Sequence, residues 1–144
     1  MRVQSQDVFH GIALTQLVEH PSFIALNKAS GRHRHYLLNQ DRRLFVKYTK
    51  IDKSPWQFVF NRGELRAINE DLGQKGHTFV VLVCGHWTVC ALDAEDIGLL
   101  LDLNRLSQWV RVEAPRRRSM SVIGSQNSLP AKVPHNSYPR KLFE

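Results

Sequence analysis

Residues 77–92 have the sequence HTFVVLVCGHWTVCAL, and the expected architecture follows from them. A valine-rich apolar run extends from Phe79 to Cys84 and ends at Gly85. A run this short is typical of a strand covered on both faces, and residues 87–92 predict a second strand that pairs back on the first. Because so hydrophobic a hairpin has to lie inside a sheet, we expect the rest of the chain to cover it.

The flanking segments show the helical and alternating apolar patterns that such a cover requires. The predicted helices lie over residues 8–20, 62–72 and 94–103. The other predicted strands lie over residues 36–40, 43–50, 56–60, 109–112 and 120–123. Asp7 is the expected N-cap of the first helix, and capping-box pairs precede the other two, Asn61 with Glu64 and Asp93 with Asp96.

This order of elements predicts a single α/β (α+β) domain over residues 1–124. Its mixed, mostly antiparallel sheet is expected to carry helices on its surface, with an αβββαβ-like core in which the first three strands form a meander. Residues 125–144 hold three of the six prolines and several basic residues, which predicts an extended, Pro-rich basic C-terminal tail.

The apolar patterns and the cysteine content also indicate where in the cell the protein is expected. No apolar stretch has the roughly 18 residues that a membrane helix needs, and the first residues lack an apolar signal core. The chain has two cysteines, Cys84 and Cys90, fewer than a disulfide-stabilised secreted domain usually has. We therefore expect a cytoplasmic protein without a membrane partner.

The formal net charge of +7 is unevenly distributed. Residues 31–53 carry seven basic and two acidic side chains, and residues 115–144 carry six basic and one acidic. Residues 54–104 carry three basic and seven acidic side chains. Two basic segments on either side of an acidic one favour a polyanionic partner.

The element order over roughly residues 8–92 is similar to the core of the PD-(D/E)XK nuclease-like fold. In that family, strand carboxylates hold Mg²⁺ against the scissile phosphate and a lysine assists the attacking water. The resemblance implies Asp41 as the first acid, Lys47 as the lysine and Glu19 as an upstream acid, with Mg²⁺ as cofactor. Phe45 takes the place of the second acid, so a member with a degraded nuclease centre is implied. The strings FVKYTK, SPWQFVF and VVLVCG also resemble short bacterial proteins of no assigned function.

Several side chains can be interpreted either as functional residues or as ordinary structural ones. Lys47 is either a phosphate-binding or catalytic lysine, or a side chain that reaches past the sheet to water. Cys84, His86 and Cys90 do not have the spacing of an established zinc site, so buried free cysteines and no metal site are expected. In a hairpin, Cys84 and Cys90 share a face only if the turn between them has an odd number of residues.

The basic clusters are the strongest functional signal. They predict a non-catalytic nucleic-acid-binding protein that contacts phosphates through two basic hairpins. The predicted contacts are Arg32, Arg34, Arg42, Arg43, Lys50, Lys53, Arg111, Arg116, Arg117 and Arg118. The aromatic residues that would stack on bases, if they face solvent, are Tyr36, Tyr48, Trp56 and Trp109. A divergent metal-dependent nuclease and a protein–protein adaptor with a docking tail are the alternatives.

Overall fold

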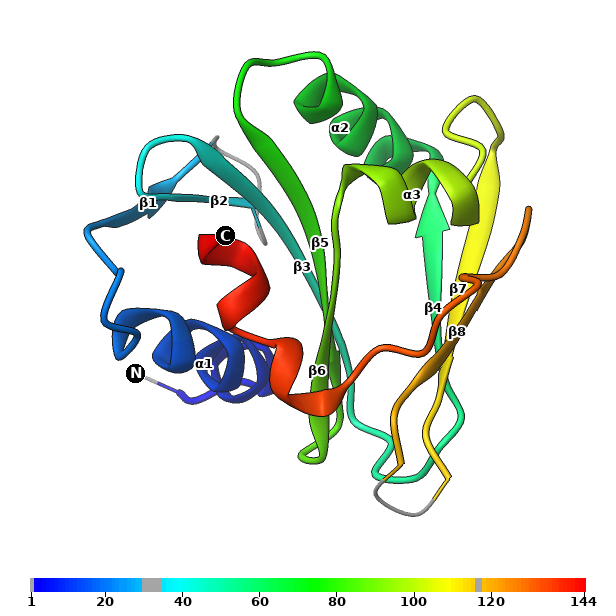
Figure 1. Ribbon diagram of the computed structural model, residues 1–144, viewed down its shortest axis with the longest axis horizontal. Helices are drawn as coiled ribbons and strands as arrows, with labels where there is room; N and C mark the ends of the chain where they lie inside the picture. The colour runs from blue at the N-terminus through cyan, green and yellow to red at the C-terminus, as the bar shows by residue number, and fades with distance from the viewer. Residues whose placement is uncertain (1, 30–34, 116–117) are drawn as a thin grey trace.

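The predicted hairpin lies inside a mixed sheet, as a computed structural model of the protein shows for residues 2–29, 35–115 and 118–144 (Figure 1). Strand β5 (His77–Cys84) pairs antiparallel with β6 (Thr88–Leu92) and parallel with β3 (Arg42–Thr49). Every β5 residue after His77 is buried. The five-stranded sheet is completed by β1 (Leu26–Lys28) and β2 (His35–Leu38), in the order β1-β2-β3-β5-β6.

Strand β4 (Trp56–Asn61) does not extend this sheet, so the predicted three-stranded meander is wrong. It pairs with β7 (Ser107–Glu113), and β7 pairs with β8 (Ser121–Gly124), to form a second, antiparallel sheet. The place beside β3 is taken by β5, and a parallel partner needs a long crossover connection. Strand β4 and helix α2 (Arg62–Leu72) form that crossover. The mixed α+β class is confirmed, but with two sheets instead of one.

The five-stranded sheet lies between two hydrophobic cores (Figure 1). One face of β5 packs with α2, α3 (Ala94–Leu100) and the three-stranded sheet, through side chains that include Val80 and Leu82. The other face packs against α1 (Ser5–Val18) and the C-terminal segment, through side chains that include Val81 and Val83. Successive side chains of β5 point to opposite faces of the sheet, so alternate residues pack into one core and the residues between them pack into the other.

The helices begin where the capping signals predict, with one shift. Both predicted capping boxes form, Asn61 with Glu64 and Asp93 with Asp96. Helix α1 instead has Gln4 as its N-cap, and Asp7 is the third helical residue that completes the box. No helix among the described residues is both long and apolar enough to cross a membrane.

Residues 125–144 pack against the domain instead of forming the expected extended tail. Short bridges join this segment to the edge of β8, and two 3-10 turns follow, η1 (His135–Ser137) and η2 (Arg140–Phe143). Tyr138 is buried and its hydroxyl donates to the Ala13 carbonyl at 2.8 Å, while Leu142 has no exposed surface. The segment therefore closes the core beside α1.

Candidate functional site

Asp41 and Lys47, two of the residues implied by the nuclease resemblance, lie far apart in the structure. Asp41 precedes β3 and contacts Arg42, whereas Lys47 lies six residues farther along an extended strand, about 20 Å away at the usual rise per residue. Glu19 is the C-cap of α1. Within the described parts of the chain, no three His, Cys, Asp or Glu side chains gather as a group that could hold a metal ion.

Lys47 has structural partners. Its ammonium donates to Glu64 at 2.7 Å and to the Val59 carbonyl at 2.7 Å, and it lies 4.9 Å from the centre of the Phe60 ring. The side chains of Lys47 and Glu64 are each only 13% exposed. Lys47 therefore joins β3 to β4 and α2 and does not reach past the sheet to water.

The first predicted basic group is divided between the two ends of β3. Arg42 and Arg43 begin the strand, where Arg42 contacts Asp41 and Arg43 donates to the Lys75 carbonyl at 2.8 Å. Lys50 and Lys53 follow the strand, about 25 Å farther along at the usual rise per residue. The described members of this group therefore lie in two places, one at each end of β3. Arg32 and Arg34 lie outside the described residues.

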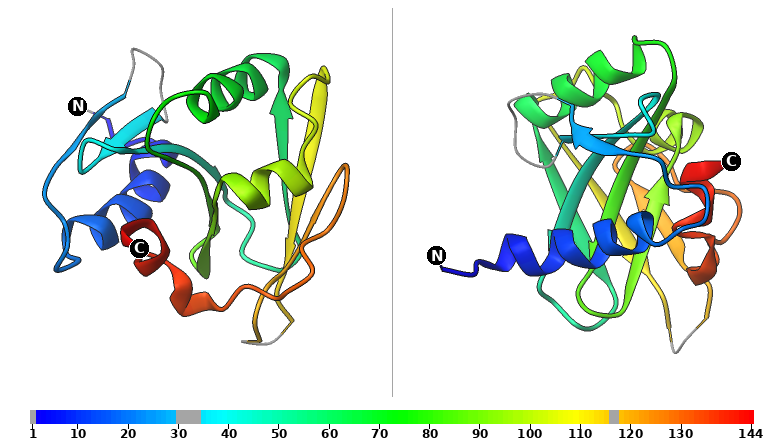
Figure 2. Two further views of the ribbon diagram at one scale, coloured as in Figure 1. Left: turned by 45° about the horizontal axis from the view of Figure 1, so that its top comes forward. Right: turned by 90° about the vertical axis from the view of Figure 1, so that its left-hand side faces the viewer.

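Three connections gather at one end of the molecule, which we call the loop end (Figures 1 and 2). It comprises residues 50–55, the turn at residues 85–87, and the described residues of the β7–β8 connection, 114–115 and 118–120. The Ala114 amide donates to the Ser54 hydroxyl at 2.8 Å, and the His86 amide donates to Asp52 at 2.9 Å. These two bonds hold the three connections together.

The loop end collects basic residues from both predicted groups. Lys50 and Lys53 come from the first group and Arg118 from the second, and all three are exposed. Arg116 and Arg117 belong to the same connection in sequence but lie outside the described residues. The two basic segments thus meet at this end of the fold, without Arg42 and Arg43.

The three-stranded sheet has an open outer face, defined by its outward-pointing side chains. Alternate residues of β4 are buried, while those between them are exposed. The outward side chains nearest the middle of the sheet are Gln57, Val59, Trp109, Arg111 and Ile123.

An aromatic–cation pair occupies the centre of this outer face. The Arg111 guanidinium lies 5.2 Å from the centre of the Trp109 ring, and Val59 pairs with Trp109 across the strands and is 55% exposed. Arg111 also contacts Glu113 at 3.6 Å, on the surface. The face therefore offers an indole, a cation and apolar area on a rigid support.

Of the four aromatic residues predicted to stack on bases, three are engaged within the fold. Tyr48 stacks on Phe9, the Tyr36 hydroxyl is bonded to His10 at 2.9 Å, and Trp56 is 3% exposed. Burial raises the pKa of Tyr36, which keeps its phenol protonated at neutral pH. Trp109 is half-buried and lies on the outer face of the three-stranded sheet, where its ring contacts Arg111.

Trp87 is an exposed aromatic residue that the sequence did not single out. It lies in the turn at residues 85–87 and is 64% exposed. A cavity of about 500 Å³ adjoins it at the loop end. The cavity is lined by Asp52, Lys53, Ser54, Trp56, Trp87, Ala114 and Pro115. The sequence predicted Trp87 as the first residue of the second strand of the hairpin, whereas β6 begins at Thr88 and Trp87 belongs to the turn.

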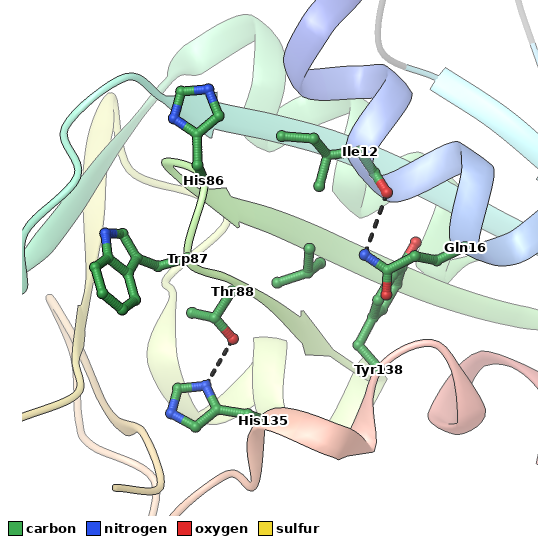
Figure 3. Close-up of a pocket in the computed structure, with 8 residues that line it drawn as sticks. Ile12, Gln16, His86, Trp87, Thr88, His135 and Tyr138 are labelled. Carbon is green, nitrogen blue, oxygen red and sulfur yellow. Dashed lines mark hydrogen bonds between the residues drawn. The ribbon is translucent and has the colours of Figure 1, made fainter. Parts of the chain in front are cut away.

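A smaller cavity of about 190 Å³ lies on the other side of the same turn (Figure 3). The Thr88 hydroxyl is bonded to His135 Nδ1 at 2.7 Å, and His135 Nε2 donates to the Arg118 carbonyl at 2.6 Å. Figure 3 shows Gln16 and Tyr138 on the far side of this cavity from Trp87. The His135 bonds attach the C-terminal segment to the loop end.

Cys84 and Cys90 are buried free thiols on the same face of the hairpin, within the core that contains α2. The turn between their strands has three residues, the odd number that places them together. Burial raises the pKa of the Cys84 thiol well above its usual range and that of Cys90 to about 12. Neither thiol is therefore a nucleophile at neutral pH.

Comparison of the chain with protein-family models, with curated proteins and with solved structures found no significant match in any of the three.

Proposed function

We propose that the protein binds single-stranded nucleic acid, without cleaving it, on the outer face of the three-stranded sheet and the adjoining loop end. The observation that carries this proposal is the Trp109–Arg111 pair at the centre of an open sheet face. An indole stacks on any base, and a guanidinium contacts either a base plane or a phosphate.

The charge at the loop end supports the same ligand. Arg111 is in β7 and pairs in register with Gln57 of β4, next to the Trp56 end of that strand. Lys53 precedes β4 and Arg118 follows β7, so their charges continue from the sheet face onto the loop end. A nucleic-acid single strand bound along β7 would contact the Trp109 ring first and then these basic side chains.

The shape of this surface favours a single strand over a duplex. Bases in a duplex are stacked on one another, and only single strands or loops offer their faces to side chains. The outer face belongs to a three-stranded antiparallel sheet, and in the described part of the chain the strands β4, β7 and β8, not a helix that could enter a major groove, form it. We therefore expect binding with little sequence preference over most of the strand.

The proposal is tested by fluorescence anisotropy of a labelled 15-nucleotide single strand in 50 mM salt. Trp109→Ala should weaken binding by about 1–3 kcal/mol, the value of one base–aromatic stack. Trp109→Phe retains an aromatic face and should keep most of the affinity. Equal affinity of wild type and Trp109→Ala, or no binding by wild type, would reject the proposed surface.

A further inference from the structure

We propose that the cavity beside Trp87 binds one unstacked base of the strand, and that the base it selects is guanine. This inference rests on the proposed nucleic-acid binding and adds a base-specific pocket to it. The sheet face and the cavity share the loop end but use different aromatic residues, Trp109 and Trp87, which allows the two ideas to be tested separately.

The cavity has the size and walls of a site for a planar ring. Its volume of about 500 Å³ lies within the usual range for small-molecule pockets. Trp87 provides an exposed indole at its margin, and Trp56, Ala114 and Pro115 provide apolar surface. The Trp56 indole is fixed, because its Nε1 donates to the Ile51 carbonyl at 2.7 Å. Trp87 lies between this cavity and the smaller one, which it also lines, and Figure 3 shows its ring directed away from Gln16 and Tyr138 on the far side of the smaller cavity.

Asp52 lines this cavity and has an oriented carboxylate. Its Oδ1 accepts from the His86 amide at 2.9 Å and is bonded to the His86 ring at 3.0 Å, while Oδ2 lies 3.3 Å from the same ring nitrogen. The side chain is nevertheless 52% exposed. The hydrogen bond from the His86 amide, and next the one from the His86 ring, lower the pKa of Asp52. The carboxyl group is therefore ionised and can only accept hydrogen bonds.

Gly85 maintains this arrangement. Its φ of +56° is in the left-handed region, and a Cβ there would collide with the Ile51 carbonyl oxygen. The turn at residues 85–87 therefore packs directly on the segment that carries Asp52. The connections that carry Trp87 and Asp52 are thus held in direct contact.

An ionised carboxylate next to an indole selects among the four bases by its hydrogen bonds. The Watson–Crick edge of guanine has two neighbouring N–H donors, at N1 and N2, which match the two oxygens of one carboxylate. Adenine and cytosine each place an acceptor beside their amino group, and uracil and thymine have one N–H between two carbonyl groups. Only guanine can donate twice to Asp52 without setting an acceptor against it.

A cationic ligand would also suit an indole and a carboxylate, but the charge around the cavity opposes it. Lys53 lines the same cavity, and Lys50 and Arg118 are exposed at the same end. A nucleotide satisfies both requirements, because its phosphate is next to these cations when its base is in the cavity.

The test is isothermal titration calorimetry of the full chain with GMP, AMP, CMP and UMP, run beside the anisotropy titration of the 15-nucleotide strand. GMP should bind about tenfold or more tightly than the others, as expected of one bidentate base contact. Trp87→Ala should weaken GMP binding about tenfold, the value of one stack, and Trp109→Ala should leave it unchanged. Asp52→Asn should remove the preference for GMP, and an unchanged melting temperature would show that the variant is folded.

The outcomes separate the two proposals. Equal binding of all four nucleotides, or a preference that survives in Asp52→Asn, would overturn the choice of guanine. Choline or agmatine binding in place of GMP would overturn the nucleotide pocket. If the strand binds but no nucleotide does, only this inference fails. If GMP binds but the strand does not, the pocket is supported and the proposed function fails.

Discussion

The Lys47 ammonium lies 2.7 Å from the Glu64 carboxylate and is enclosed between β3, β4 and α2. Glu64 also accepts from the Asn61 amide at 3.0 Å, so a single carboxylate both caps α2 and pairs with the lysine of the neighbouring sheet. The one lysine in the middle of β3 thus joins the two sheets of the fold.

We predict that Lys47→Ala destabilises the protein without changing its affinity for a single strand. The substitution leaves a mostly buried carboxylate without its cation, which should cost roughly 2–4 kcal/mol. Urea denaturation gives the free energy of unfolding, with the exposed Lys50→Ala as a control that should lie within about 0.5 kcal/mol of wild type. Loss of nucleic-acid binding by a stably folded Lys47→Ala would return Lys47 to a functional role.

The two cysteines should be unreactive in the folded protein. Their burial raises the pKa of both thiols, that of Cys90 to about 12, so almost no thiolate forms at pH 8. A colorimetric thiol reagent at pH 8 should therefore detect no rapidly reacting thiol in native protein. Both cysteines should react at once in guanidinium chloride. Rapid labelling of the native protein would contradict the buried hairpin.

Lys141 should attach the C-terminal segment to α3 in a pH-dependent way. Its ammonium donates to Asp96 at 2.8 Å and to the Ala91 carbonyl at 3.3 Å. Burial alone would lower the pKa of Lys141, but the hydrogen bond to Asp96 and the charges of Asp96 and Asp93 raise it above 10.5. The stabilisation is therefore complete below the ordinary lysine pKa and is lost as the pH rises through the folded-state value.

The measurement is urea denaturation of wild type and Lys141→Met at pH 7 and in strong alkali. At pH 7 the variant should be less stable by about 1–2 kcal/mol, as expected of a partly exposed charged hydrogen bond. The difference should shrink in strong alkali, as the pH rises through the raised pKa of Lys141 and wild type also loses the charge. A difference that is constant with pH would mean that Lys141 acts by packing alone.

Local patterns predicted most of the elements because they depend on neighbouring residues. The valine-rich run of β5 and the alternation of Trp56, Phe58 and Phe60 in β4 were sufficient to identify two strands. The capping pairs fixed the starts of α2 and α3. What the sequence did not predict was the sheet to which β4 belongs, because strand pairing is decided by contacts between residues distant along the chain.

The surface was harder to predict than the core. The charge pattern identified the basic segments, but it did not reveal that Arg43 and Lys53 lie at opposite ends of β3. The C-terminal segment has the composition of an extended tail, yet Tyr138 and Leu142 anchor it in a core that is formed mainly by α1 and the five-stranded sheet. Trp87 was missed because nothing local distinguishes an exposed turn tryptophan from one that folds inward.

The most direct test of nucleic-acid binding at the loop end is the salt dependence of affinity for the labelled 15-nucleotide strand, measured between 50 and 200 mM salt. The variant Lys53→Ala/Arg118→Ala should bind more weakly than wild type. Its slope of log affinity against log salt should be shallower by roughly 1.4, because each of the two lost phosphate contacts contributes about 0.7 for a single strand. The control Lys28→Ala/Arg66→Ala removes the same charges elsewhere on the surface and should retain the wild-type slope. An unchanged slope in the loop-end variant, or an equal loss in the control, would contradict binding at this end of the molecule.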